Sequence, residues 1–115
     1  MTLEELNLLA FQKPKLQDTV IISFGKFNGI DELNEVDIKL FKNIPSNIGM
    51  YDGHEVNMDD TYGRLYAYGK NAEALFIVMK PLLNEYEIFK NAKVYLEFTK
   101  NGEVISNLEF KMNHE

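Results

Sequence analysis

The run TVIISFGKF at residues 19–27 constrains the fold of this chain more than any other stretch. Its β-branched and aromatic residues are typical of a strand, and its first positions are apolar on both faces. This pattern predicts a central strand in a sheet that buries it. Gly25 is expected to mark a bulge or the end of the strand.

A first helix after this strand is predicted over residues 32–44. The turn at Asn28-Gly29 precedes it, Asp31 is expected to be its N-cap residue, and Pro45 ends it. Apolar residues recur along the helix at a helical spacing and define the face that packs on the sheet. These residues are Leu33, Val36, Leu40, Phe41 and Ile44.

A second helix is predicted from residue 72 to about residue 88, with Asn71 as its N-cap. Pro81 lies inside this range, removes one backbone hydrogen bond and clashes with the carbonyl of Ile77. Either a kinked helix or two abutting shorter helices are therefore expected. The apolar stripe consists of Leu75, Phe76, Met79, Leu82, Leu83 and Tyr86.

Two hairpins complete the predicted sheet. Residues 49–56 and 62–68 flank a polar turn, and residues 92–99 and 103–112 flank the turn at Asn101-Gly102. Without an N-terminal helix and the last strand, the order of elements is βαββαβ, which is that of a ferredoxin-like α+β fold. The sheet is expected to be antiparallel, with the strand order 5-4-1-3-2 and with both helices on one face.

The register of the second hairpin follows from keeping its apolar residues on one face. A two-residue loop would set Val94 opposite Glu109, which mixes the two faces. A three-residue loop, with Gly102 in the left-handed conformation, sets Val94 opposite Leu108 instead and is therefore preferred. This register also pairs Lys93 with Glu109 on the other face.

The chain has 115 residues and no cysteine, which fits a single domain over residues 1–115 without disulfide bonds. A short helix is predicted over residues 2–10, where Thr2 and Glu5 match a capping box, and residues 1–18 form an N-terminal helical extension. The acidic start does not match a secretory signal, and no apolar run approaches the roughly 20 residues of a membrane span. A cytoplasmic protein without membrane contact is therefore expected.

The first hairpin carries the candidate binding site. Leu65 and Ala67 of strand 62–68 are expected to face the helices, so the aromatic and charged residues between them lie on the open face of the sheet. If Val56 pairs with Tyr62, residues 52 and 54 join that open face, whereas Gly53 and Tyr51 face the helices. The predicted site then consists of Asp52, His54, Arg64, Tyr66 and Tyr68.

Two kinds of chemistry were weighed for this hairpin. His54 with Asp52 or Glu55 is a candidate acid–base pair, but a surface histidine explains the pattern as well. Asp59 and Asp60 could complete a cation site with these three residues, but the spacing matches neither an EF-hand nor HExxH. Neither a GxSxG motif nor a cysteine supplies a nucleophile. We therefore predict no catalytic residue, no metal and no cofactor.

The charge of the chain bears on its partners. Acids outnumber Lys and Arg by 18 to 12, and the net charge is −6. Bases could stack on Tyr66 and Tyr68, but the acidic balance and the scattered lysines disfavour nucleic acid. Tyrosine and arginine are also enriched in protein interfaces, so another protein or a second copy of this chain is the expected partner. A merely solvated face is the simpler explanation of the same residues.

The segments GMYDGHE at 49–55, GRLYAYG at 63–69 and NAEALF at 71–76 resemble a family of small bacterial proteins. The resemblance covers residues 30–115 and implies no functional residue, because no established activity is attached to that family. A small acidic chain without a catalytic motif is also similar to immunity proteins, as an analogy.

These observations lead to two hypotheses about function. The first is a non-enzymatic binding module of the immunity or regulatory type, which acts through the open sheet face and includes self-association as a homodimer. One subclass is an inhibitor whose acidic surface neutralises a basic toxin. The alternative is a small enzyme or ligand sensor that uses His54, Asp52, Arg64 and the tyrosines.

Overall fold

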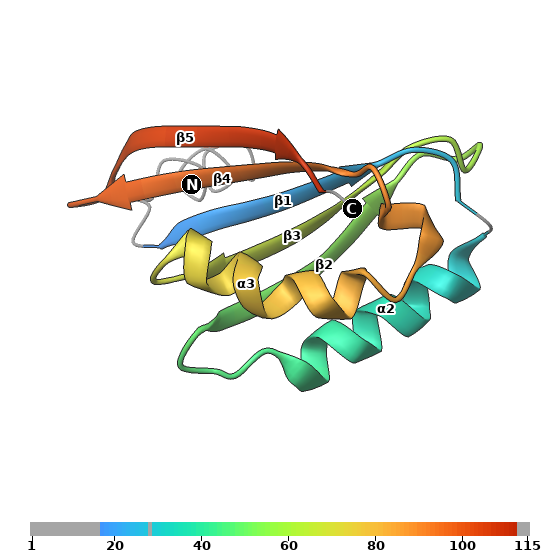
Figure 1. Ribbon diagram of the computed structural model, residues 1–115, viewed down its shortest axis with the longest axis horizontal. Coiled ribbons are helices and arrows are strands. Elements are labelled where there is room, and N and C mark those ends of the chain that lie inside the picture. Colours follow the sequence, from blue (N-terminus) through green and yellow to red (C-terminus); the bar gives the residue numbers. More distant parts are fainter. Residues whose placement is uncertain (1–16, 28, 113–115) are drawn as a thin grey trace, which may run out of the picture.

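The computed structural model describes residues 17–27 and 29–112, and the predicted helix over 2–10 lies outside this part. The described residues form a five-stranded antiparallel sheet, two α-helices and a short 3₁₀ helix (Figure 1). In chain order the elements are β1 (Asp18–Phe24), α2 (Ile30–Asn43), β2 (Gly49–Val56), β3 (Gly63–Gly69), α3 (Ala72–Leu83), η1 (Glu87–Phe89), β4 (Lys93–Lys100) and β5 (Glu103–Lys111).

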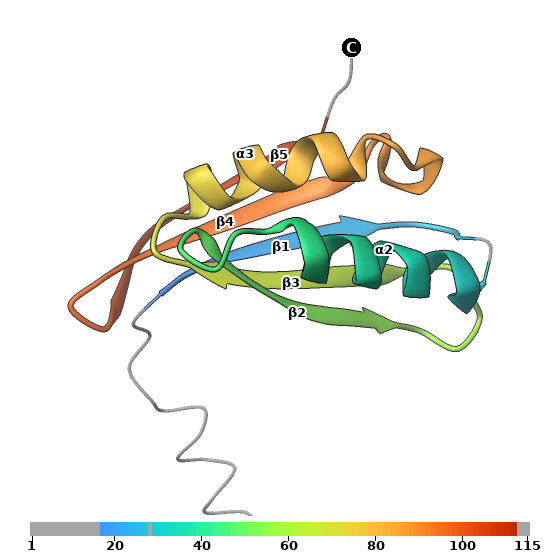
Figure 2. The ribbon, with the colours of Figure 1, turned by 90° about the horizontal axis from the view of Figure 1, so that it is seen from below.

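The sheet has the strand order β2-β3-β1-β4-β5, which is the predicted order when it is read from the other edge. The central place of β1 is confirmed, because β3 and β4 pair with it on either side. Figure 2 shows α2 and α3 on the same face of the sheet. Within the described residues no helix covers the opposite face, which we call the open face.

The start of α2 differs from the prediction. The helix begins at Ile30, and its N-cap position is occupied by Gly29, which forms no side-chain cap. The predicted cap, Asp31, lies in the first helical turn instead. A carboxylate in the first turn still interacts favourably with the helix dipole, which is why the sequence carries an acid there.

The structure decides between the kinked helix and the two shorter helices that Pro81 predicted for residues 72–88. The predicted cap at Asn71 is confirmed, since its side chain accepts a hydrogen bond of 2.9 Å from the N–H of Ala74. The helix ends at Leu83, soon after Pro81, and the separate 3₁₀ turn η1 follows from Glu87. Two short helical segments therefore replace the single helix to residue 88, because proline removes a hydrogen bond from the last turn.

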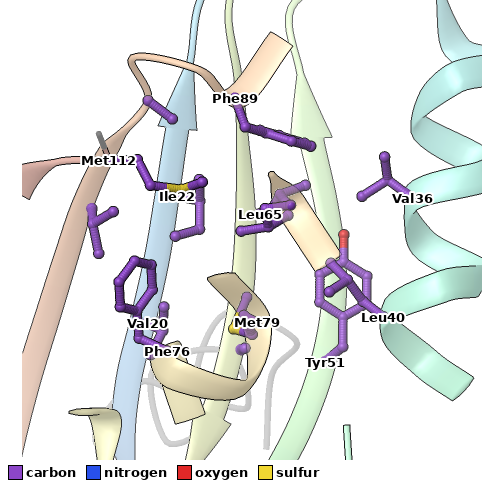
Figure 3. Close-up of a cluster of buried hydrophobic side chains, with 14 of the residues drawn as sticks. Val20, Ile22, Val36, Leu40, Tyr51, Leu65, Phe76, Met79, Phe89 and Met112 are labelled. Atoms are coloured by element: carbon purple, nitrogen blue, oxygen red, sulfur yellow. The ribbon is translucent and has the colours of Figure 1, made fainter. Parts of the chain in front are cut away.

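The core lies between the two helices and the sheet (Figure 3). The predicted stripes pack there except for Phe41, which is 59% exposed; Leu82 is partly buried and packs against the core. Phe41 follows Leu40 by one residue and therefore lies about 100° around the helix from it. Its ring instead meets the edge of Tyr51, with the ring centroids 5.0 Å apart.

The second hairpin has a different register from the predicted one. Its loop is the two-residue Asn101-Gly102, with φ of 54° and 82°, and an irregularity after Phe98 adds one residue to β5. Val94 consequently lies opposite Phe110 rather than Leu108. From Ser106 onward the error is a shift of two residues, so the faces are as predicted although the partners are not. Nearer the turn the shift is one residue, and Val104 lies opposite Thr99 instead of Phe98, on the other face.

Candidate functional site

A bulge in β2 decides which residues of the first hairpin reach the open face. Tyr51 pairs with Ala67 as predicted, but the register shifts by one residue between Tyr51 and Gly53. After the shift, His54 lies opposite Leu65 instead of Arg64, and Gly53 lies opposite Tyr66. The extra residue in the bulge therefore reverses the faces predicted for His54 and Gly53.

His54 lies on the helix side of the sheet, not in the predicted site. Its Nδ1 atom is 2.8 Å from Oδ2 of Asp37 in α2, which is an ion-pair distance without the angle of a hydrogen bond. The other oxygen of Asp37 accepts a 2.6 Å hydrogen bond from the hydroxyl of Tyr51. Burial, and then this carboxylate, raises the pKa of Tyr51 far above its usual range. The three side chains tie β2 to α2.

The other predicted residues do lie on the open face, and Glu55 takes the place of His54 beside them. Glu55 is opposite Arg64 and accepts a 2.8 Å hydrogen bond from the hydroxyl of Tyr66. The pKa of Tyr68 is raised by burial and, second, by the carboxylate of Asp52. Asp52, Glu55 and the two tyrosines therefore form one polar set on this face.

The open face also holds a groove of about 770 Å³ at the end of β1 that leads to α2. Its floor comes from the strands and its rim from the segment around η1. Of the five predicted site residues, only Arg64 lines it. The lining residues are Ile21, Ser23, Phe24, Gly25, Lys26, Tyr62, Arg64, Glu87, Ile88, Lys90, Asn91, Ala92, Lys93, Tyr95, Glu109 and Lys111.

A row of cations crosses the sheet inside this groove. Ser23 of β1 pairs with Arg64 on one side and with Lys93 on the other, and Lys93 pairs in turn with Lys111. Three cations on three strands are thus aligned around one hydroxyl group. Glu109 lies 3.3 Å from the Nζ atom of Lys93, so the contact predicted between these two residues is present, although they are not directly opposite.

The hydroxyl group of Tyr62 lies among the hydrogen-bond donors and cations of the groove. The Nε atom of Arg64 donates a 2.6 Å hydrogen bond to the hydroxyl oxygen of Tyr62. This bond, a second one with Ser23, and the charges of Arg64 and Lys93 lower the pKa of Tyr62. Elsewhere in the described chain burial raises the pKa of Tyr51, Tyr68, Tyr86 and Tyr95. Tyr62 therefore differs from these four tyrosines, because two hydrogen bonds and then two nearby cations favour its ionised form.

The sequence alone did not indicate this groove. Its cations are separated along the chain, and each looks like an isolated surface residue until the strands are paired. The one available signal was strand periodicity, because Ser23, Arg64 and Lys93 all occupy open-face positions of adjacent strands.

Comparison with known proteins assigns this chain to no family. The chain matches no family model, no curated protein and no solved structure. Within residues 17–27 and 29–112 no cluster of three or more His, Asp or Glu side chains could hold a metal ion. No helix in that same part of the chain has the length and apolar character needed to cross a membrane.

Proposed function

We propose that this protein is a non-enzymatic binding module that holds an anionic ligand in the groove on its open face. The observation that carries the proposal is the row of Arg64, Lys93 and Lys111 within a groove of about 770 Å³. Five of the 12 Lys and Arg residues line the groove, against two of the 18 acids, so a chain of net charge −6 concentrates positive charge there. A volume of this size is typical of small-molecule sites.

The arrangement of the row supports an anion rather than a neutral ligand. Lys93 and Lys111 lie directly opposite each other on neighbouring strands, where like charges destabilise a sheet. Glu109 offsets part of this repulsion through its 3.3 Å contact with Lys93, and an anion that bridges the two lysines offsets the rest and accepts charge-assisted hydrogen bonds. The guanidinium group of Arg64 and the hydroxyl group of Ser23 add further donors on the same row.

Titration with inorganic phosphate, followed by amide NMR, tests the proposal. We expect saturable shifts of the amides of Ser23, Arg64 and Lys93, and at least a tenfold weaker affinity in a Lys93→Gln, Lys111→Gln double variant. The matched control is Lys42→Gln with Lys70→Gln, which removes the same charge outside the groove and should leave the affinity unchanged. Equal affinities in both double variants would refute the proposed site.

The predicted alternative, a small enzyme or ligand sensor, combines residues that the register separates. His54 faces α2 and Arg64 faces the groove, so the two side chains lie on opposite faces of the sheet. A sensor of anions that uses Arg64 without His54 remains compatible with the proposal.

The second candidate function is contact with another protein or with a second copy of this chain. The edge strand β5 exposes Val104, Ile105 and Leu108 to between 45% and 60%, and its outer edge has no partner among the described strands. An immunity-type contact with a basic partner would instead use the acidic surface outside the groove. The order β1-α2-β2-β3-α3-β4 supports a ferredoxin-like classification, which we propose with this function.

Sedimentation velocity tests the second candidate. If β5 mediates self-association, Ile105→Lys should convert a dimer to a monomer. Ile77→Lys, which changes an exposed residue of α3, should leave the dimer intact. A chain that is monomeric at all concentrations contradicts self-association and leaves the anion site untouched.

A further inference from the structure

We infer that the ligand of the groove is a small phosphate monoester whose phosphate is attached to a flat aromatic body. This inference rests on the proposed function, and it specifies both ends of the ligand. The geometry that points to it is a pair of adjacent rows on the open face, one with Arg64, Lys93 and Lys111 and one with Ile21 and Tyr95, which Glu109 ends.

The cationic row sets the charge of the ligand. Five positive and two negative side chains line the groove, which leaves it with a formal charge of +3. A carboxylate would neutralise one of these charges, whereas a phosphate monoester carries nearly two negative charges at neutral pH. Three terminal oxygens also match a site with several separate donors, here Arg64, Lys93, Lys111 and the hydroxyl of Ser23.

The neighbouring row sets the character of the rest of the ligand. Ile21 precedes Ser23 by two residues on β1 and pairs with Tyr95 of β4. Two residues along a strand correspond to roughly 7 Å, so the aliphatic and aromatic surface begins one short molecular length from the cations. Ile88 and Tyr62 line the same groove from the rim, and Tyr62 is 41% exposed.

A flat ring suits this surface better than a flexible chain. Tyr95 offers a rigid aromatic side next to Ile21, which lies between β3 and β4, whereas Tyr62 precedes Arg64 by two residues and lies on the other side of the cationic row. Aromatic rings stack on such side chains with little loss of conformational entropy. The guanidinium group of Arg64, which already lies 5.4 Å from the centre of the Tyr62 ring, can contact both the ring and the phosphate of the ligand.

Calorimetric titration of the full chain with three probes tests the inference. We expect phenyl phosphate to bind at least tenfold more tightly than inorganic phosphate, and also more tightly than benzoate, which has the ring but a single charge. Tyr95→Ala should reduce the affinity for phenyl phosphate to that for inorganic phosphate and leave the latter unchanged. Because Tyr95 is half-buried, this variant is expected to fold.

The outcomes separate the two proposals. If inorganic and phenyl phosphate bind equally, the aromatic body is refuted while the anion site stands. If benzoate equals phenyl phosphate, the preference for a phosphate is refuted. If no probe binds, the proposed function itself fails. Two further probes then locate the ring relative to the phosphate. O-phosphotyrosine, an aryl phosphate, should match the affinity of phenyl phosphate, whereas adenosine 5′-monophosphate, whose phosphate is attached to ribose, should bind more weakly; the reverse order refutes a phosphate attached directly to the ring.

Discussion

At the scale of single residues, Asp18 is a buried polar side chain that joins three elements of the fold. Its carboxylate accepts hydrogen bonds from the N–H of Ala72 at 2.9 Å and from the N–H and hydroxyl of Thr99 at 2.8 and 3.2 Å. Asp18 is 6% exposed. It therefore joins the start of β1 to the first residue of α3 and to the end of β4.

Asp18→Ala should lower the free energy of unfolding by about 2–4 kcal/mol, because it leaves buried N–H donors without an acceptor. Asp18→Asn should also destabilise the fold, since its amide NH₂ must face a donor. Urea denaturation followed by circular dichroism measures both. The control is Asp31→Ala in the first turn of α2, where the loss should stay below about 1 kcal/mol. A similar loss in the two alanine variants would contradict the role given to Asp18.

The contrast between Asn71 and Asp18 shows what a sequence reveals about single residues. The Asn71 cap was predictable because its partner, Ala74, is three residues away and the pattern is local. The partners of Asp18 are 54 and 81 residues away, so no local pattern identifies them. The contact of His54 with Asp37 escaped prediction for the same reason.

At the scale of elements, strand faces were predictable and strand registers were not. Side chains alternate between the two faces of a strand, and this alternation correctly predicted that Leu65 and Ala67 face the helices, where both are buried. A bulge adds one residue to a strand and reverses every face beyond it until the strand ends. Such an irregularity occurs in β2 after Tyr51, and another separates the two halves of the β4–β5 hairpin. The first moved His54 out of the predicted site. The second, together with the shorter loop, restored the predicted faces of β5 from Ser106 onward but left Val104 on the other face.

Gly53→Ala should destabilise the protein by about 1–2 kcal/mol, although a methyl group at this position meets no atom within 4 Å. Gly53 has a φ of 109° in the bulge of β2, and an L-residue is strained there whatever the space around it. The matched control is Gly25→Ala, whose φ is not positive and which should be neutral or slightly stabilising. Thermal denaturation of both variants checks the prediction, and equal melting temperatures would contradict it.

At the scale of the whole molecule, the order of the strands creates the groove. Strand order and helix placement followed from the sequence of elements, since few topologies join them with short connections. The alignment of Arg64, Lys93 and Lys111 required the observed pairing of β3, β1, β4 and β5, which no local pattern gives. A site assembled from four strands is therefore the part of this protein that a single sequence reveals least.

The overall charge limits which anions can use this groove. A small dianion reaches the +3 groove, whereas an extended polyanion also meets the rest of a chain whose net charge is −6. At about 0.1 M salt the Debye length is ~10 Å. The positive charge of the groove therefore attracts an anion within the groove but has little effect on charges farther away.

A fluorescent single-stranded oligonucleotide should therefore show no change in anisotropy at protein concentrations that saturate with phenyl phosphate. Glu87→Gln with Glu109→Gln raises the groove charge by two and should tighten the binding of phenyl phosphate several-fold. The variant keeps a net charge of −4 after losing two of the six excess negative charges, so it should still not bind the oligonucleotide. Binding of the oligonucleotide to the native chain as tightly as phenyl phosphate would show that the open face is a nucleic-acid surface instead.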